Sequence, residues 1–292
     1  MIPSGTDKRA RAQIDRRLAQ DPAVGAEPRG DIYGRIKVHP DRFNLRSLPM
    51  ETRVMAKSLL RNDKPKPFVI YGRPRSGTTL LVHLLDQVPQ VRCDGELLRC
   101  LLMDPVGFLC RLPRRAGADL AAYGVKVISY HLLEVQRVRR PLAFFDKLAA
   151  QDYAVLHLTR NTWDQTLSLA KAHASAVYFS SKDPRHQKIS IDPDRFLDLL
   201  RWNEAVIAYE RKVMAYVPHL PIRYDIDLKS AGMHQPSIDR VCDFLGVPSG
   251  PVTAHFKRTG GKDGLHTTEN SQELIRHVRG SELAHLVPDT LD

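Results

Sequence analysis

The sequence lacks the features that define membrane-spanning and secreted proteins. No stretch of 18 residues is free of charged side chains, which excludes a transmembrane helix. The first eight residues have no apolar core of the kind that a secretory signal requires. We therefore expect a cytoplasmic protein without a membrane span.

Cysteine and metal-ligand patterns are also sparse. Four cysteines among 292 residues form no Cys-x-x-Cys pair, and the twelve histidines form no His-x-x-x-His pair. This spacing indicates neither a disulfide scaffold nor a zinc site. We expect a reducing environment and no metal requirement.

Aromatic residues make up only 7% of the chain and do not alternate with basic ones, although the net charge is +11. Stacking platforms for nucleic acid are therefore not indicated, and the positive charge suits an anionic small molecule. Steeply salt-dependent binding to DNA or RNA would support the nucleic-acid alternative. Residues 1–66 hold 15 basic and 8 acidic residues. We interpret them as a basic extension, helical at 10–19 and 50–61, that precedes one domain at 67–292.

Apolar runs alternate with helical patterns through that domain. Four runs are expected to form strands, at 68–71, 125–130, 153–159 and 222–228. Helical spacing is found at 78–88, 163–177, 195–216 and 238–245. This alternation predicts an α/β fold, a single P-loop-like domain with a mainly parallel central sheet flanked by helices.

The most informative segment is Gly72-Arg-Pro-Arg-Ser-Gly-Thr-Thr-Leu80, between the first strand and a helix. A glycine-bounded turn at a helix N-terminus presents free backbone N–H groups to an anion. Gly72 and Gly77 keep the spacing of a nucleotide-binding P-loop, but Thr78 takes the position of its lysine. That lysine normally reaches the β- and γ-phosphates, so its absence argues against ATP chemistry. Arg75 supplies a cation inside the loop instead.

A second anion site is predicted after the strand at 153–159. Arg160 ends this strand, and Ser168 follows eight residues later, in the next helix. Ligands of open α/β sheets gather at the carboxyl ends of the strands, where an arginine can hold a phosphate through two bonds. Two such sites on one sheet edge indicate a ligand with phosphates at two separate positions.

These two motifs resemble those of sulfotransferases that use 3′-phosphoadenosine 5′-phosphosulfate (PAPS). The segment 74–79 resembles the family's 5′-phosphosulfate loop, and 160–168 resembles its 3′-phosphate motif. The segment 73–96 is similar to the tyrosylprotein sulfotransferases. The segment 164–170 is closer to bacterial sulfotransferases that act on trehalose and on Nod-factor sugars. Looser matches at 223–228 and 243–247 extend the resemblance over about residues 67–280.

The resemblance implies transfer of a sulfuryl group from PAPS to a hydroxyl acceptor, most simply on a sugar or glycoconjugate. PAPS would leave as adenosine 3′,5′-bisphosphate, and no metal is needed. Tyr224 matches a tyrosine that the tyrosylprotein enzymes place against the 3′-phosphate. The donor-binding residues that the resemblance implies are Arg75, Ser76, Gly77, Thr78, Thr79, Arg160, Ser168 and Tyr224.

The resemblance also implies two catalytic residues. Arg75 would stabilise negative charge on the bridging oxygen, as an electrostatic clamp that keeps its proton. Glu96 would be the base for the acceptor hydroxyl, and we expect burial to raise its pKa toward the working pH. Asp94 and His131 are the alternative bases.

Other assignments remain open at the level of sequence. Arg276 resembles a late lysine of the tyrosylprotein enzymes, and Lys257 and Arg258 are further candidates for the 3′-phosphate. The segments 97–123, 179–193 and 255–271 are expected to be loops that form the acceptor pocket. Tyrosine sulfation of a peptide is the alternative within this class, and a P-loop nucleotide kinase is the alternative from another class. The oligomeric state is open, a homodimer included.

Overall fold

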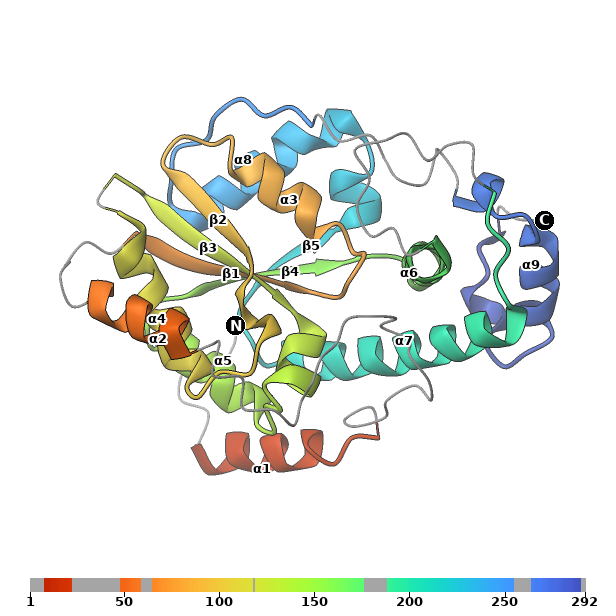
Figure 1. The fold of residues 1–292 in the computed structure, drawn as a ribbon, viewed down its shortest axis with the longest axis horizontal. Helices are drawn as coiled ribbons and strands as arrows, with labels where there is room; N and C mark the ends of the chain where they lie inside the picture. Colours follow the sequence, from red (N-terminus) through yellow and green to blue (C-terminus); the bar gives the residue numbers. More distant parts are fainter. Residues whose placement is uncertain are drawn as a thin grey trace.

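The computed structural model describes residues 8–22, 48–58, 65–117, 119–175, 188–254 and 264–289. A single five-stranded sheet lies at its centre (Figure 1). All four strand pairs are parallel, and the strand order is β2-β3-β1-β4-β5. The strands are β1 (Lys66–Gly72), β2 (Val91–Glu96), β3 (Ala122–Ile128), β4 (Ala154–Thr159) and β5 (Leu220–Arg223). The α/β prediction is confirmed.

The prediction of a strand over 222–228 is wrong in its second half. β5 ends at Arg223, and Tyr224–Leu228 forms a π-helical turn. The carboxylate of Asp227 accepts a hydrogen bond of 2.6 Å from the backbone N–H of Arg223. This side chain therefore takes a backbone donor that a longer strand would use, and the turn brings Tyr224 to the end of the sheet.

Helices cover both faces of the sheet, as the continuous burial of its central strands requires. Figure 1 shows α3 (Thr78–Leu85) and α8 (His234–Leu245) over one face. The opposite face is covered by α4 (Pro105–Ala116), α5 (Pro141–Ala149) and α7 (Pro193–Met214). Ile70 of β1 packs in the apolar cluster under α3 and α8, whereas its neighbour Val69 packs in the cluster on the other face. The segment 97–123, expected to be a loop, instead contains α4 and the first residues of β3.

The segment 1–66 contributes two helices that pack on the second face. They are α1 (Lys8–Leu18) and α2 (Leu48–Ser58), close to the ranges that the sequence predicted. Leu18 and Val54 are buried in the same apolar cluster as β1 and β3. The carboxylate of Asp15 accepts hydrogen bonds from the backbone N–H groups of Leu142 (2.8 Å) and Ala143 (3.0 Å), in the first turn of α5. The helices of this segment are thus part of the packed structure.

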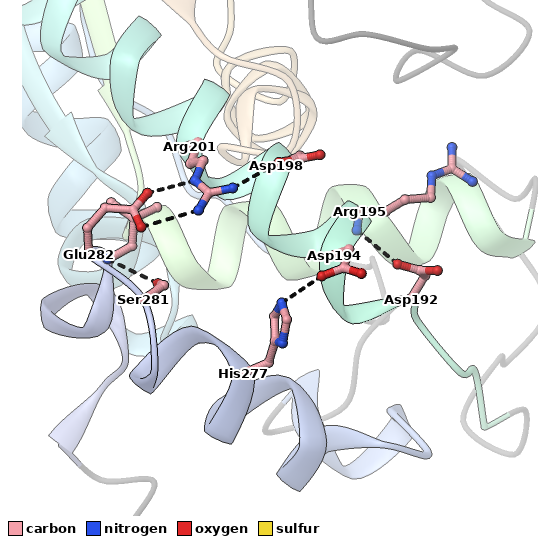
Figure 2. Close-up of polar contacts among 9 residues, drawn as sticks. Asp192, Asp194, Arg195, Asp198, Arg201, His277, Ser281 and Glu282 are labelled. Carbon is pink, nitrogen blue, oxygen red and sulfur yellow. Dashed lines mark hydrogen bonds and ion pairs between the residues drawn. The ribbon is translucent and has the colours of Figure 1, made fainter.

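A further layer is formed by α6 (Thr162–Ser175), α7 and α9 (Ser271–Arg279). Their apolar side chains share one cluster beside the sheet. Figure 2 shows the polar contacts between α7 and the C-terminal region: His277 lies 3.0 Å from Asp194, and Arg201 makes an ion pair with Glu282 at 2.6 Å. No helix among the described residues is long and apolar enough to cross a membrane.

The topology determines where a ligand can bind. The chain after β1 runs through α3 to β2 at one edge of the sheet, whereas the chain after β4 runs through α6 and α7 to β5 at the other edge. β1 and β4 are neighbours, so their outgoing connections diverge. The carboxyl ends of such a strand pair are where open α/β sheets bind ligands. Both predicted phosphate motifs lie there.

Candidate active site

The loop between β1 and α3 requires both of its glycines. A Cβ atom on Gly72 would lie 2.5 Å from the carbonyl oxygen of Leu158 on β4. Gly77 has a φ of 99°, and a Cβ there would lie 2.4 Å from the Tyr224 ring. The left-handed backbone and the close ring together leave room only for glycine.

The N-terminus of α3 is open to an anion. The first hydrogen bond of this helix runs from the Leu81 N–H to the Gly77 carbonyl (3.1 Å), and no side chain caps the helix. The N–H groups of Thr78 and Thr79 therefore have no partner within the helix. The Ser76 hydroxyl is buried and donates to the Arg73 carbonyl at 2.8 Å. Ser76 thus shapes the loop, and the first turn of α3 provides the anion site.

The two predicted phosphate motifs contact each other directly. Arg75 has a φ of 64°, and its Nε donates to the Ser168 hydroxyl on α6 at 3.1 Å. Arg160, at the end of β4, donates from Nη1 to the Arg75 carbonyl at 3.0 Å. The structure therefore brings together Arg75, Arg160 and Ser168, which the sequence placed in two separate motifs.

Tyr224 completes this group. Its ring lies under the Arg160 guanidinium, 4.5 Å from the centroid to the carbon, and also packs against Gly77. Arg160 Nε is buried and has no hydrogen-bond partner among the residues that the structure describes. A polar cavity of about 540 Å³ adjoins Arg160 and is lined also by Arg211 and His285. A buried guanidinium donor without a partner is suited to receive an anionic ligand.

Glu96 lies at the end of β2, facing three donors. Its carboxylate is 2.7 Å from the Lys126 ammonium and 3.5 Å from His131 Nε2. Lys126 also donates to the Thr79 hydroxyl at 3.2 Å, which joins Glu96 to the first turn of α3. The Tyr130 hydroxyl is 3.5 Å from the same carboxylate. About a third of the Glu96 side chain is exposed, so a ligand can reach it.

The expectation that burial raises the Glu96 pKa toward the working pH is wrong. Burial does raise the pKa, but the hydrogen bond from His131 and the charge of Lys126 lower it more, to about 2. Glu96 is therefore an ionised carboxylate at neutral pH.

A β-bulge decides which acidic residue faces α3. Asp94 pairs with Val125, but Glu96 pairs with the next residue of β3, Lys126, so Gly95 is the extra residue. Asp94 accepts a hydrogen bond from the Tyr123 hydroxyl, on the α4 and α5 face. Alternate residues of a regular strand share one face, and the bulge instead turns Glu96 to the opposite face. Asp94 and Glu96 therefore lie on opposite faces of the sheet.

His131 is buried and has a fixed tautomer. The backbone N–H of Ile128 donates to its Nδ1 at 3.1 Å, so the proton of the neutral ring is on Nε2, which faces Glu96. Burial lowers the His131 pKa, which favours this neutral ring. His131 is thus placed as a donor to the Glu96 carboxylate.

Sequence analysis missed Lys126 and Gln165. Gln165, buried on α6, donates to the Pro74 carbonyl of the loop at 2.7 Å. A signal for Lys126 was present: it is a charged residue in the apolar run 122–128, and its side chain is 9% exposed in the structure. A buried lysine in a strand that ends at the ligand-binding edge indicates a functional role.

The structure does not bring every candidate to this site. Arg276 is exposed on α9, and its Nε contacts the Gln272 carbonyl one turn earlier at 3.4 Å. No contact among the described residues joins it to the loop. Lys257 and Arg258 lie outside the described residues, as do 179–187 and 255–263 of the expected acceptor loops.

Two sequence comparisons with known proteins agree with the two motifs. Residues 67–188 match the model of the "Sulfotransferase family". The chain is 29% identical to nodulation protein H of Rhizobium tropici, over 75% of this chain and 92% of that protein. A crystal structure of a sulfotransferase from Alicyclobacillus acidocaldarius matches with a TM-score of 0.44 and 15% identity, covering 77% of this chain and 97% of that one.

The family model and nodulation protein H confirm the resemblance to the sulfotransferase superfamily that was noted in the sequence. The same two matches support an enzyme of sulfuryl transfer.

Proposed function

We propose that this enzyme transfers the sulfuryl group of PAPS to a hydroxyl on a sugar or glycoconjugate. The observation that carries the proposal is the 3.1 Å contact of Arg75 with Ser168. It joins the two motifs on one sheet edge, which supports a donor with phosphate groups at the 3′ and 5′ positions of one ribose.

The residues at this edge suit that donor. The free N–H groups at the start of α3, with the hydroxyls of Thr78 and Thr79, would hold the 5′-phosphosulfate. Arg160 and Ser168 would hold the 3′-phosphate, with Tyr224 stacked against the arginine. The buried, unpartnered Nε of Arg160 supports this assignment.

Arg75 would act as the electrostatic clamp of the reaction. Sulfuryl transfer, like phosphoryl transfer, depends on in-line positioning and on stabilising charge at the leaving oxygen. A guanidinium inside the loop would lie close to that oxygen, and it keeps its proton at all working pH values. Its bond to Ser168 orients the side chain before the reaction.

Glu96 would accept the proton of the acceptor hydroxyl. It faces α3 beside Thr79, is partly exposed and is ionised at neutral pH. Asp94 faces the other side of the sheet, and His131 directs a proton toward Glu96. These placements favour Glu96 over both alternatives. A carboxylate of low pKa is a weak base, so this assignment rests on the position and ionised state of Glu96 and not on its basicity.

The acceptor class rests on the resemblance of segment 164–170 to bacterial sugar sulfotransferases. Peptide tyrosine is the alternative, supported by the similarity of segment 73–96 to the tyrosylprotein enzymes. A screen with radiolabelled donor against sugars and acidic tyrosine peptides separates the two. Labelling of peptides alone would reverse our choice.

Calorimetry of nucleotide binding tests the donor. We expect adenosine 3′,5′-bisphosphate to bind without metal, more tightly than 5′-AMP or ATP, and Arg160→Ala to remove that preference. Arg276→Ala, which changes an exposed arginine outside the site, is the matched control. Binding of ATP with Mg²⁺ but not of the bisphosphate would favour the nucleotide-kinase alternative instead.

A further inference from the structure

The phosphate loop is joined to α6 through consecutive residues. The Pro74 carbonyl accepts a hydrogen bond from Gln165, and Arg75 donates to Ser168. Gln165 and Ser168 both belong to α6, which follows the 3′-phosphate arginine. The preceding loop residue, Arg73, turns the other way, into the protein interior, where its side chain is 3% exposed.

Arg73 reaches α6 through α7. Its Nη2 donates to Oδ1 of Asn203, on α7, at 2.6 Å. Asn203 Nδ2 donates to the Thr166 hydroxyl of α6 at 2.8 Å, and that hydroxyl donates to the Thr162 carbonyl at 2.7 Å. Asn203 and Thr166 are both 0% exposed. The buried Asn203 amide thus connects Arg73, at the start of the first phosphate loop, to α6, the helix of the second phosphate site.

The interior end of Arg73 is held on other sides as well. Its guanidinium lies 4.5 Å over the Trp202 ring, and Nη1 is 3.6 Å from the fully buried Glu210 carboxylate. Burial raises the Glu210 pKa, and the charge of Arg73 opposes that rise. Side chains of α7 therefore fix the Arg73 guanidinium, and Asn203 connects it to α6.

We propose that Asn203 is a positioning residue that sets the separation of the two phosphate sites, and with it the preference for a nucleotide phosphorylated on both the 3′ and the 5′ positions. This inference rests on the proposed function. Asn203 acts through Arg73 on one side and Thr166 on the other. An asparagine suits this place because its carbonyl accepts from the cation while its amide donates to the hydroxyl.

The test substitution is Thr166→Val, which keeps the side-chain shape and removes only the hydroxyl that Asn203 contacts. Asn203→Leu, which removes both contacts, is the stronger but less conservative variant, because it leaves Arg73 without its amide partner. Tyr153→Phe is the control: it removes a buried hydroxyl that donates to the Leu109 carbonyl, at the amino end of β4, away from the site.

Calorimetry measures the dissociation constants of adenosine 3′,5′-bisphosphate and of 5′-AMP for each full-length variant. We expect Thr166→Val to reduce the preference for the bisphosphate about tenfold, and to change 5′-AMP binding less than about threefold, because only the distance to the second site changes. Tyr153→Phe should lower the melting temperature and leave the preference unchanged. In an Arg160→Ala background, Thr166→Val should have no further effect on the preference, since the group that it positions is absent.

Two results would overturn the inference, and they differ. If the wild type prefers the bisphosphate and Thr166→Val keeps the same preference, the buried amide does not set the spacing. The proposed function would then remain intact. A wild-type chain that binds both nucleotides equally overturns the proposed function and this inference together.

Discussion

The Lys126 ammonium lies 2.7 Å from the Glu96 carboxylate and 3.2 Å from the Thr79 hydroxyl. One buried cation on β3 therefore joins the candidate base to the first turn of the donor-binding helix. This contact helps to lower the Glu96 pKa to about 2, because the bond from His131 and the charge of Lys126 outweigh the effect of burial.

Removing that cation should change the titration of Glu96. We expect Lys126→Met to raise the Glu96 pKa above about 2, because His131 then opposes the effect of burial without the charge of Lys126. Carboxyl NMR of a glutamate-labelled protein reads this midpoint. Lys147→Met, an exposed lysine on α5, is the control. An unchanged midpoint in Lys126→Met would show that the ion pair does not control Glu96.

The same shift predicts how stability depends on pH. The pKa of Glu96 is lower in the folded protein than in the unfolded chain, so its ion pair stabilises the fold fully above about pH 4.5 and loses this effect as the pH falls toward 2. We expect Glu96→Gln to flatten the loss of stability in that window, as measured by urea unfolding at a series of pH values. An equally steep loss in wild type and variant would contradict this.

Ser168 should contribute to donor binding both directly and through Arg75. We expect Ser168→Ala to weaken binding of adenosine 3′,5′-bisphosphate about tenfold or more, because a hydrogen bond to a charged group is worth about 1.5–3 kcal/mol. Ser249→Ala removes an exposed hydroxyl that contacts Asp239 and should leave binding unchanged. Equal affinities in wild type and Ser168→Ala would remove Ser168 from the donor site.

Alanine substitutions at Gly77 and Gly246 distinguish the effect of backbone strain from that of a steric clash. Gly77 and Gly246 both have positive φ, but only a Cβ on Gly77 would meet the Tyr224 ring, whereas Gly246 has open space. We expect alanine at either position to lower stability by about 1 kcal/mol or more. Only Gly77→Ala should also abolish bisphosphate binding in calorimetry. Retained binding in Gly77→Ala would mean that the loop tolerates displacement of Tyr224.

Asp15 should stabilise the fold from outside the helix that it caps. Its buried carboxylate accepts two backbone hydrogen bonds at the start of α5. We expect Asp15→Ala to lower the free energy of unfolding by about 1–2 kcal/mol, as the loss of a helix cap does. Asp146→Ala breaks the exposed ion pair with Arg11 and should cost less than about 1 kcal/mol. Equal losses in denaturant unfolding would contradict the capping role.

The parts of the fold that depend on local pattern could be predicted from the sequence. β1, the glycine loop and α3 follow one another within 20 residues, so an apolar run, turn residues and helical spacing identify them together. The end of β4 and the start of α6 could be predicted in the same way, from an apolar run followed by helical spacing. The pairing of Arg75 with Ser168 then needs only the parallel sheet, which places both strand ends side by side.

The remaining features depend on contacts that local pattern does not encode. The face on which Glu96 lies depends on a register shift against β3, some 30 residues further along the chain. The burial of Arg73 depends on Asn203, which is 130 residues away. The lowered pKa of Glu96 needs the positions of Lys126 and His131, so burial alone predicted the wrong direction.

The bulge at Gly95 has a consequence for how related chains are compared. Asp94 and Glu96 are two positions apart yet serve opposite sides of the sheet, because of a single extra residue. Deleting Gly95 would restore a regular strand and leave the second acid opposite Lys126, on the same face as now. A strand that kept Gly95 without the bulge would instead turn that acid to the face of Asp94, although an alignment would show the same residues. In this segment, the register against β3 determines which acid faces the donor-binding helix, and chemical similarity at a column does not.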